Sequence, residues 1–468
     1  MDAESQLGIW SVVPPIVAVV LAFVTREAIL ALLAACLAGL YIAGNGLWGL
    51  PALFQRALGT PDFIWVVLVE VCIGILVAFF LTTASTQRFG ELAGRHLRSA
   101  RHVQVFGWLL GTIIFFSDYF SPLLTGPVMR PLTDRARVSR EKLAYICDST
   151  SAPTCILVPL SAWGVFISGL LVGHGPVMDN TAAMSLYIKS VFFDFYAILA
   201  VGMVLLFALG AIPEFGPMRK AERRARSEGK VLADGARPMM SAELAEMQPA
   251  EQIRTPRLFW NFFLPLTLVV SIALGSFLLS GKAMILEAFM SAVLLLAIAL
   301  WVQKVPLGSI VGVAIQGIKG VVPAMLLLAL AYTLNTLSRE LGTAIYVVEV
   351  TRGWLTPGLL PTAVFLLCAI VSFSTGTSWG TYAIVIPIAV PLAFEFSGGE
   401  VNTLVFATVA AVAGGGVFGD HCSPLSDTTI LSSFGAACDH MDHVRTQLPY
   451  ALVAAGISVG LYLLLGTV

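Results

Sequence analysis

A short acidic phrase occurs twice in this sequence, and each copy interrupts an apolar stretch. Residues 116–123 and 418–425 both read F-x-D-x-x-S-P-L, so that Asp118 and Asp420 hold the same place in the two copies. Carboxylates, hydroxyls and the carbonyls freed by proline provide the oxygen ligands that hard cations such as Na⁺ prefer. A duplicated, proline-broken acidic segment predicts the midplane ion site of a secondary transporter built from two repeats.

Two more aspartates stand among hydroxyl side chains. Asp148 begins the run D-S-T-S-A-P, and Asp427 lies in S-P-L-S-D-T-T. Asp427 aligns with Thr125 of the first copy, so it has no symmetric counterpart, and this asymmetry favours it as the group that binds and releases protons. For all four aspartates the competing interpretation is a carboxylate that caps a broken helix and binds nothing, because Asp and Ser are good N-caps.

A hydroxyl-rich run at residues 372–381, S-F-S-T-G-T-S-W-G-T, is flanked by aliphatic residues. It is typical of a hairpin tip or an unwound helix, although a small-residue packing face would have the same composition. The residues predicted to bind ion or substrate are Asp118, Ser121, Asp148, Ser149, Thr150, Ser374, Thr375, Thr377, Ser378, Asp420, Ser423, Ser426, Asp427 and Thr428.

Three further acidic residues, Glu70, Asp194 and Glu287, lie in plain apolar sequence. A charged side chain in a membrane helix is costly and needs a reason. For these three we favour interhelical hydrogen bonding, or a position near the membrane interface, over an ion site.

Enzyme and metal motifs are weak. Residues 376–380 match G-x-S-x-G, but that motif needs a strand–turn–helix on an α/β sheet, which the sequence does not predict. Residues 438–443, C-D-H-M-D-H, lack paired C-x-x-C spacing, so we interpret them as a polar loop at a membrane edge. Their histidines could titrate near neutral pH. We expect no catalytic residue, no cofactor and no metal beyond transported Na⁺.

The elements that must position these residues are membrane helices. The chain is 57% hydrophobic and only 12% charged, against about 25% charged residues in a soluble domain. Apolar runs long enough to cross a bilayer recur throughout. They predict an all-α polytopic membrane protein with about 11–13 transmembrane segments. Such a protein is surrounded by the lipid bilayer, and we expect no nucleic acid as a partner. Whether it forms a homodimer is left open.

Basic residues cluster at positions 88–101, 130–142 and 219–230. The positive-inside rule places all three clusters in the cytoplasm. Only residues 103–129 separate the first two clusters, so this segment must enter and leave the membrane on one side. Such a re-entrant, broken segment is tolerated only where it is buried in protein or lines a water-filled cavity.

One long polar stretch, residues 213–257, divides the chain. We predict a first membrane repeat at 1–212, a cytoplasmic linker at 213–257, and a second repeat at 258–468. Whether residues 258–303 form an extra helical hairpin within the second repeat is left open. The two repeats begin on opposite sides of the membrane, as inverted-topology repeats do. The predicted location is the cell (inner, cytoplasmic) membrane, with many passes.

The residues around the second copy resemble a known family. Residues 418–433 and 438–450 are similar to the C-terminal signature of the NhaC-type sodium/proton antiporters, and residues 129–134 and 139–153 look like the matching first-half segment. The resemblance implies an inverted-repeat fold of the ion-transporter superfamily and Na⁺/H⁺ exchange or a related antiport. Some members are thought to exchange organic acids or other small solutes. Where the family often reads F-F-D-D-Y-A-N, this chain has F-F-S-D-Y-F-S at 115–121. The loss of one carboxylate and one amide could alter stoichiometry or substrate.

We therefore predict a secondary active antiporter that exchanges Na⁺ for H⁺ by alternating access. The alternative is a Na⁺- or H⁺-coupled transporter of a small organic acid or amino acid on the same fold. A membrane enzyme would need a nucleophile and base that the sequence does not supply, and buried acids in duplicated breaks disfavour a channel.

Overall fold

The computed structural model describes residues 7–466 apart from residues 26, 86–87, 90–91, 93–96, 98, 116, 160, 240–256, 281–283, 344, 347–349 and 351–355. The described residues form helices and no strand, with one isolated bridge between Pro238 and Asp439. Residue 116 of the first phrase and most of the second half of the predicted linker thus lie outside the described residues. The all-α fold class predicted from the sequence is confirmed.

Seven described helices are long and apolar enough to span a membrane, and three bent helix pairs raise the total to ten if each pair is one span. Two shorter apolar helices, Gly8–Ala22 and Leu360–Thr375, accompany them. Counted together, these segments fall within the predicted range. The bent pairs also confirm that broken helices are part of the fold, since their axes turn by 111°, 42° and 52° at short breaks.

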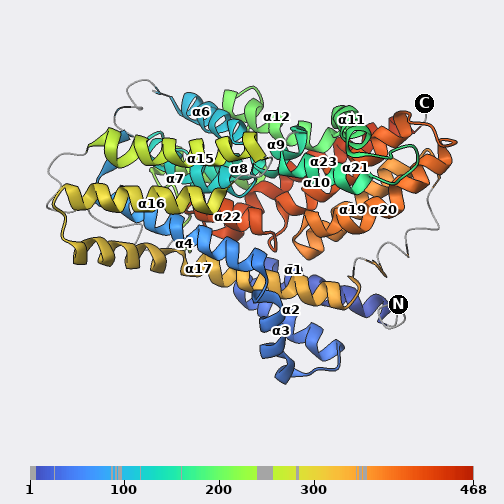
Figure 1. Ribbon diagram of the computed structural model, residues 1–468, viewed down its shortest axis with the longest axis horizontal. Coiled ribbons are helices and arrows are strands. Elements are labelled where there is room, and N and C mark those ends of the chain that lie inside the picture. The colour runs from blue at the N-terminus through green and yellow to red at the C-terminus, as the bar shows by residue number, and fades with distance from the viewer. Residues whose placement is uncertain are drawn as a thin grey trace.

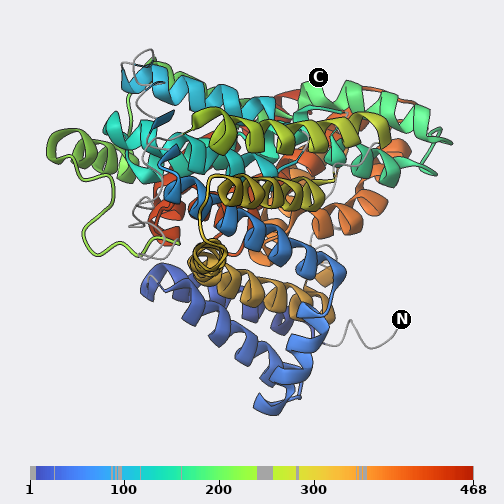
Figure 2. The ribbon, with the colours of Figure 1, turned by 60° about the vertical axis from the view of Figure 1, so that its left-hand side comes forward.

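The helices form two layers, which both ribbon views separate (Figures 1 and 2). The lower layer comprises α1 (Val13–Thr25), α2 (Ala28–Ile42), α3 (Leu50–Leu58), α4 (Pro61–Thr82) and α17 (Leu307–Glu340). Beside it lie α15 (Leu264–Ser280) and α16 (Ile285–Val302), which share one apolar core with α1, α2, α4 and α17. At the contact of α4 and α17, the backbones of Gly74 and Gly317 touch, because neither residue has a side chain to hold them apart.

The upper layer contains both copies of the duplicated phrase. Its helices are α6 (Ala100–Ile113), α7 (Phe120–Arg135), α8 (Arg140–Ser149), α9 (Ala152–Leu157), α10 (Ala162–Leu171), α11 (Asn180–Ser190), α12 (Phe195–Leu209), α13 (Gly216–Glu228), α19 (Leu360–Thr375), α20 (Ser378–Phe396), α21 (Thr403–Cys422), α22 (Asp427–Ala436) and α23 (His440–Leu465).

The first copy lies at a break between α6 and α7. Ser121 Oγ donates to the carbonyl of Gly111 over 3.1 Å, and Met129 packs against Gly107 further along the two helices. Contacts that pair residue 111 with 121 and residue 107 with 129 belong to an antiparallel hairpin. The chain therefore turns back within residues 103–129, as predicted; the membrane side on which it enters remains a prediction.

The second copy lies at the break between α21 and α22. From there α22 crosses α7, and the backbones of Gly126 and Gly435 are in direct contact at the crossing. Downstream of both copies the chain reads R-x-x-L-x-Y, at residues 140–145 and 445–450. The tyrosines of these two blocks also meet, since the ring centroids of Tyr145 and Tyr450 are 5.1 Å apart. The two broken segments are thus packed against each other at the centre of the upper layer.

The described part of the predicted linker is packed against this layer. Its helix α13 lies beside α8 and α23. The Glu222 carboxylate accepts hydrogen bonds from the amide and hydroxyl of Ser139, both at 2.9 Å. The buried Lys142 forms an ion pair with Glu214 at 2.7 Å. These contacts fix the start of α8, whose last turn holds Asp148.

Candidate functional site

Asp420 is the one of the four predicted aspartates whose two carboxylate oxygens each accept a hydrogen bond from a serine hydroxyl. It is 2% exposed in the last turn of α21. Ser378 Oγ donates to Oδ2 over 2.7 Å, and Ser426 Oγ donates to Oδ1 over 2.6 Å. Because Ser378 begins α20 and Ser426 lies in the break after α21, this carboxylate joins two predicted broken segments.

The hydroxyl-rich run is itself the break between α19 and α20. Gly376 ends α19 at φ +70°, a left-handed conformation that favours glycine. A side chain at Gly376 would strike the backbone of Leu425, and Ser423 Oγ donates to the carbonyl of Phe373 over 2.7 Å. The predicted unwound tip therefore exists, and it is packed against the break that follows Asp420.

Some predicted hydroxyls are used locally. Ser374 and Thr375 both donate to the carbonyl of Val371, at 3.0 and 2.8 Å. Thr150 donates to the carbonyl of Ile146 over 2.7 Å, one turn back on its own helix. Each of these hydroxyls still has lone pairs, but the structure does not bring them to a carboxylate.

Asp118 and Asp427 come from opposite halves of the sequence and lie close together. The hydroxyl of Tyr119 donates to Asp427 Oδ2 over 2.6 Å, so the residue after Asp118 is bonded directly to the second copy. The carboxylates of Asp118, Asp420 and Asp427 lie within Coulombic range of one another. Asp118 is 4% exposed, and its Oδ2 has no hydrogen-bond partner among the described residues.

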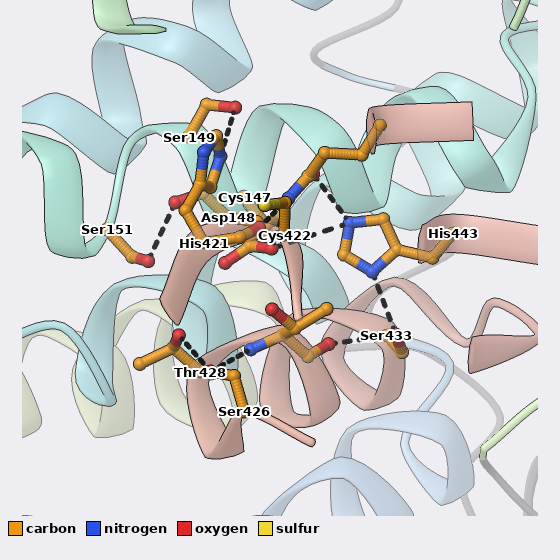
Figure 3. A network of polar contacts seen from close by, with 12 residues as sticks. Cys147, Asp148, Ser149, Ser151, His421, Cys422, Ser426, Thr428, Ser433 and His443 are labelled. Atoms are coloured by element: carbon orange, nitrogen blue, oxygen red, sulfur yellow. Dashed lines mark hydrogen bonds and ion pairs between the residues drawn. The ribbon is translucent and has the colours of Figure 1, made fainter. Parts of the chain in front are cut away.

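Asp148 is bound by α23 (Figure 3). Gln447 Nε2 donates to its Oδ2 over 2.7 Å, and His443 Nε2 lies 3.6 Å from the same oxygen. The other oxygen, Oδ1, is buried without a hydrogen-bond partner in the described part of the chain. The neighbouring Ser149 bonds to His421 Nε2 at 2.8 Å.

Reasoning from the sequence missed several of these partners. They are Tyr119, Tyr196, His421, Ser433, His443 and Gln447. Tyr196 contacts the other ring nitrogen of His421 at 2.7 Å. The available signals were that Tyr119 and His421 lie within the duplicated phrase and Gln447 within the repeated R-x-x-L-x-Y block.

The histidines near the C-terminus do not lie in a polar loop, so that prediction is wrong. Residues 440 and 443 open α23 and are 4% and 0% exposed. His440 bonds to the carbonyl of Pro424 at 2.9 Å, and both imidazoles contact Ser433, at 3.1 and 2.8 Å. The first turn of α23 is buried because it packs against the break that follows Asp420.

The other three acidic residues differ from one another. Asp194 caps α12 by accepting from the amide of Ala197 over 3.1 Å, and Glu287 is exposed in the first turn of α16. The exposed Glu287 fits the predicted position near an interface, whereas Asp194 is 2% exposed and bonds to its own helix rather than to a neighbouring one. Glu70 is fully buried in α4, and neither carboxylate oxygen has a hydrogen-bond partner among the described residues.

A cavity of about 600 Å³ lies where the two layers meet. Its lining includes Trp65 of α4, Tyr332 of α17 and Trp379 of α20. Tyr119 and Asp427 also line it, so the cavity reaches the two broken segments. The arrangement can therefore bring a solute from outside the helix bundle to the aspartate cluster.

Comparison with known proteins decides the family. The model of the Na⁺/H⁺ antiporter family matches residues 155–467. The chain belongs to this family. The NhaC-type resemblance is thereby confirmed, and the apolar helices and family membership together make this antiporter-family member a multi-pass membrane protein.

Three relatives match this chain over different shares of its length. An uncharacterized protein of Haemophilus influenzae is 32% identical over 98% of the chain and 91% of its own length. The malate-2H⁺/Na⁺-lactate antiporter of Bacillus subtilis is 33% identical over 24% of the chain and 22% of its own length. The Na⁺/H⁺ antiporter NhaC of Alkalihalophilus pseudofirmus is 30% identical over 24% of the chain and 27% of its own length.

Proposed function

We propose that this protein is a secondary active antiporter that exchanges Na⁺ for H⁺ across the cytoplasmic membrane by alternating access. The observation that supports this most is the meeting of the two broken segments, which places Asp118, Asp420 and Asp427 within Coulombic range of one another. The family, and the similarity to a protein named as a Na⁺/H⁺ antiporter, are consistent with that chemistry.

Competition between Na⁺ and H⁺ follows from the burial of these carboxylates. A buried charge without a counter-charge costs free energy, and several ionised carboxylates in one site repel one another. One oxygen each of Asp118 and Asp148 has no hydrogen-bond partner among the described residues, and a proton or a cation would satisfy it. Since both ligands use the same oxygens, binding of one displaces the other.

Within this proposal the aspartates have different roles. Asp118 and Asp420 coordinate Na⁺ from the two copies, with the hydroxyl oxygens of Ser378 and Ser426 close to Asp420. Asp427, which has no counterpart in the first copy, completes the same site and carries the proton when Na⁺ is absent. Asp148, with one oxygen that has no hydrogen-bond partner among the described residues, offers a second acidic site.

The coupling rule has the same physical origin. A site loaded with Na⁺ or with protons is close to neutral and can pass through the low-dielectric interior. An empty, charged site cannot, because desolvating bare carboxylates is too costly. The cost of moving the empty, charged site is therefore enough to prevent uncoupled movement of Na⁺ or protons.

The sidedness of the loops and the division into repeats are proposed with this mechanism. Residues 1–212 and 258–468 are the two repeats, and 213–257 is a cytoplasmic linker. Cysteines at Arg101 and Arg137, on the two flanks of the α6–α7 hairpin, should both react with a membrane-impermeant reagent added from the cytoplasmic side. Reaction from opposite sides would show that this segment crosses the membrane once.

The direct test is proton movement in proteoliposomes that contain the purified chain. Na⁺ or Li⁺ gradients should drive proton movement, K⁺ should drive much less, and an ionophore that collapses the pH gradient should abolish the signal. If no alkali cation drives protons at any pH between about 6 and 9, a range that spans the titration of groups near neutrality, Na⁺/H⁺ exchange is wrong for this protein.

A further inference from the structure

The cavity between the two layers is far larger than a cation requires. Its volume of about 600 Å³ lies within the roughly 300–1,000 Å³ of small-molecule sites. Aromatic side chains form much of its wall, including Trp65, Phe166 and Trp379. Such walls bury the carbon skeleton of an organic molecule, and they offer nothing to a Na⁺ ion that prefers oxygen ligands.

One face of α17 supplies several of the polar groups of the cavity. Asn335, Ser338 and Arg339 line it, at positions that share one side of a helix. Asn335 Oδ1 and Ser338 Oγ are buried, and neither has a hydrogen-bond partner among the described residues. Since buried polar atoms normally have partners, a ligand that reaches these two atoms would supply the hydrogen bonds that they lack.

Arg339 gives the cavity an exposed positive charge with which no carboxylate of the described residues forms an ion pair. Its guanidinium forms no ion pair or hydrogen bond within the described part of the chain. The adjacent Glu340 is engaged elsewhere, because it accepts two hydrogen bonds from Arg56 at 2.7 and 3.0 Å. The planar guanidinium matches the two oxygens of a carboxylate.

We infer that this cavity binds a small organic solute through its carboxylate, with Arg339 as the counter-charge and Asn335 and Ser338 as further hydrogen-bonding groups. The inference rests on the proposed function, since it makes the solute a second cargo of the same cation-coupled carrier. An α-amino acid and a hydroxy acid share the carboxylate chemistry and differ in the group beside it.

Asp427 links solute binding to cation binding. It lines the same cavity, and its negative charge opposes a bound carboxylate. A Na⁺ ion or a proton at Asp427 removes that repulsion, so the solute binds more tightly to the loaded carrier. By thermodynamic reciprocity the solute must strengthen cation binding by the same factor.

The test is solute-dependent thermal stabilisation of the purified full chain, because a ligand that binds the folded state raises the unfolding temperature. The probes are L-lactate, L-malate and L-alanine, with lactamide as the uncharged counterpart of lactate. Each is titrated in NaCl and in choline chloride at equal ionic strength. At least one carboxylate should stabilise the protein, more strongly in NaCl, and lactamide should not. The probe that stabilises most distinguishes hydroxy acid from amino acid.

Arg339→Gln should weaken carboxylate binding by about tenfold or more, because it removes a charge-assisted pair. Arg339→Lys keeps the charge but loses the planar fork, so it should bind with intermediate affinity and controls for misfolding of the glutamine variant. Lys319→Gln removes a positive charge from an exposed position on the same helix and should bind as wild type does.

Three results would overturn the inference: no probe stabilises the protein, lactamide acts as lactate does, or Arg339→Gln binds as wild type does. Asp427→Asn should make solute binding independent of Na⁺, and a Na⁺ dependence that persists in this variant contradicts the link. If proteoliposomes show no Na⁺-driven proton movement but solute binding still needs Arg339, the proposed exchange fails and the solute site stands.

Discussion

The two copies of the duplicated phrase have the same spacing but different surroundings. Asp420 sits in the last turn of α21, and hydroxyls bind both of its oxygens. Asp118 lies in the loop before α7 and keeps one oxygen without a donor in the described structure. Both donors to Asp420 lie outside the phrase, Ser378 at the start of α20 and Ser426 one residue beyond the end of the second copy. Duplication thus repeats the carboxylate, whereas its partners come from elsewhere and make the two sites unequal.

The variable positions of the phrase increase this difference. Tyr119 in the first copy aligns with His421 in the second. The tyrosine bonds to Asp427, whereas the histidine bonds to Ser149 and Tyr196. Each copy therefore reaches across to the opposite half of the chain through a different side chain. Because of these hydrogen bonds, a displacement of either broken segment also displaces side chains of the opposite half of the chain.

The largest expected effect is the loss of either central carboxylate. Asp420→Asn and Asp118→Asn should each reduce Na⁺-driven proton movement to background, because an amide neither binds Na⁺ strongly nor exchanges a proton. Proteoliposome assays provide the measurement. Asp179→Asn is the matched control, because Asp179 is an exposed N-cap and Asn caps helices equally well. Full exchange in both site variants would refute the assignment of these residues.

Next in size is the contact between the two breaks of the second half. Gly376→Ala should lower the unfolding temperature markedly, since it adds a clash with the Leu425 backbone to the strain of a positive φ. Gly398 has a similar φ of +64° but open space around it. Gly398→Ala therefore measures the strain alone. Equal destabilisation of the two variants would mean that the close packing against Leu425 contributes little.

A smaller effect is expected from the hydroxyls that hold Asp420. Ser378→Ala and Ser426→Ala each remove one hydrogen bond to a charged group, worth about 1.5–3 kcal/mol, which corresponds to roughly tenfold or more in apparent Na⁺ affinity. Ser374→Ala is the control, because that hydroxyl donates to its own helix at Val371. If the control loses as much affinity as the site variants, Asp420 is not organised by these two serines.

The smallest expected effect is at the bridge between the copies. Tyr119→Phe removes the hydrogen bond to Asp427, but Asp427 is only partly buried and keeps its bond to the amide of Thr428. We expect a change of about threefold in apparent Na⁺ affinity, since solvent can replace part of the lost bond. Tyr41→Phe, at a site that is 82% exposed, should change nothing. A loss as large as that of Asp420→Asn would make Tyr119 part of the ion site itself.

The features that could be predicted from the sequence are those that cost free energy locally. An acid, a proline or a run of hydroxyl residues inside apolar sequence costs free energy unless it serves a purpose. The sequence could therefore place Asp118, Asp420 and Ser378 at breaks in the membrane helices. The partners from distant helices could not. Nothing local to Gln447 or His443 indicates that they face Asp148, because that pairing depends on how α8 and α23 pack. The same reason explains the wrong placement of the histidines in a loop.

Two helices of the shared core, α17 of the lower layer and α16 beside it, differ greatly in length. At 1.5 Å per residue, the 34 residues of α17 extend about 51 Å and the 18 residues of α16 about 27 Å. A hydrocarbon layer of about 30 Å cannot match both helices when they stand upright. The longer helix must tilt steeply or project into water, and the bilayer must thin beside the shorter one. The activity of this protein should therefore depend on the thickness of the membrane around it. Transport measured after reconstitution in lipids of increasing acyl-chain length would give the size of that dependence.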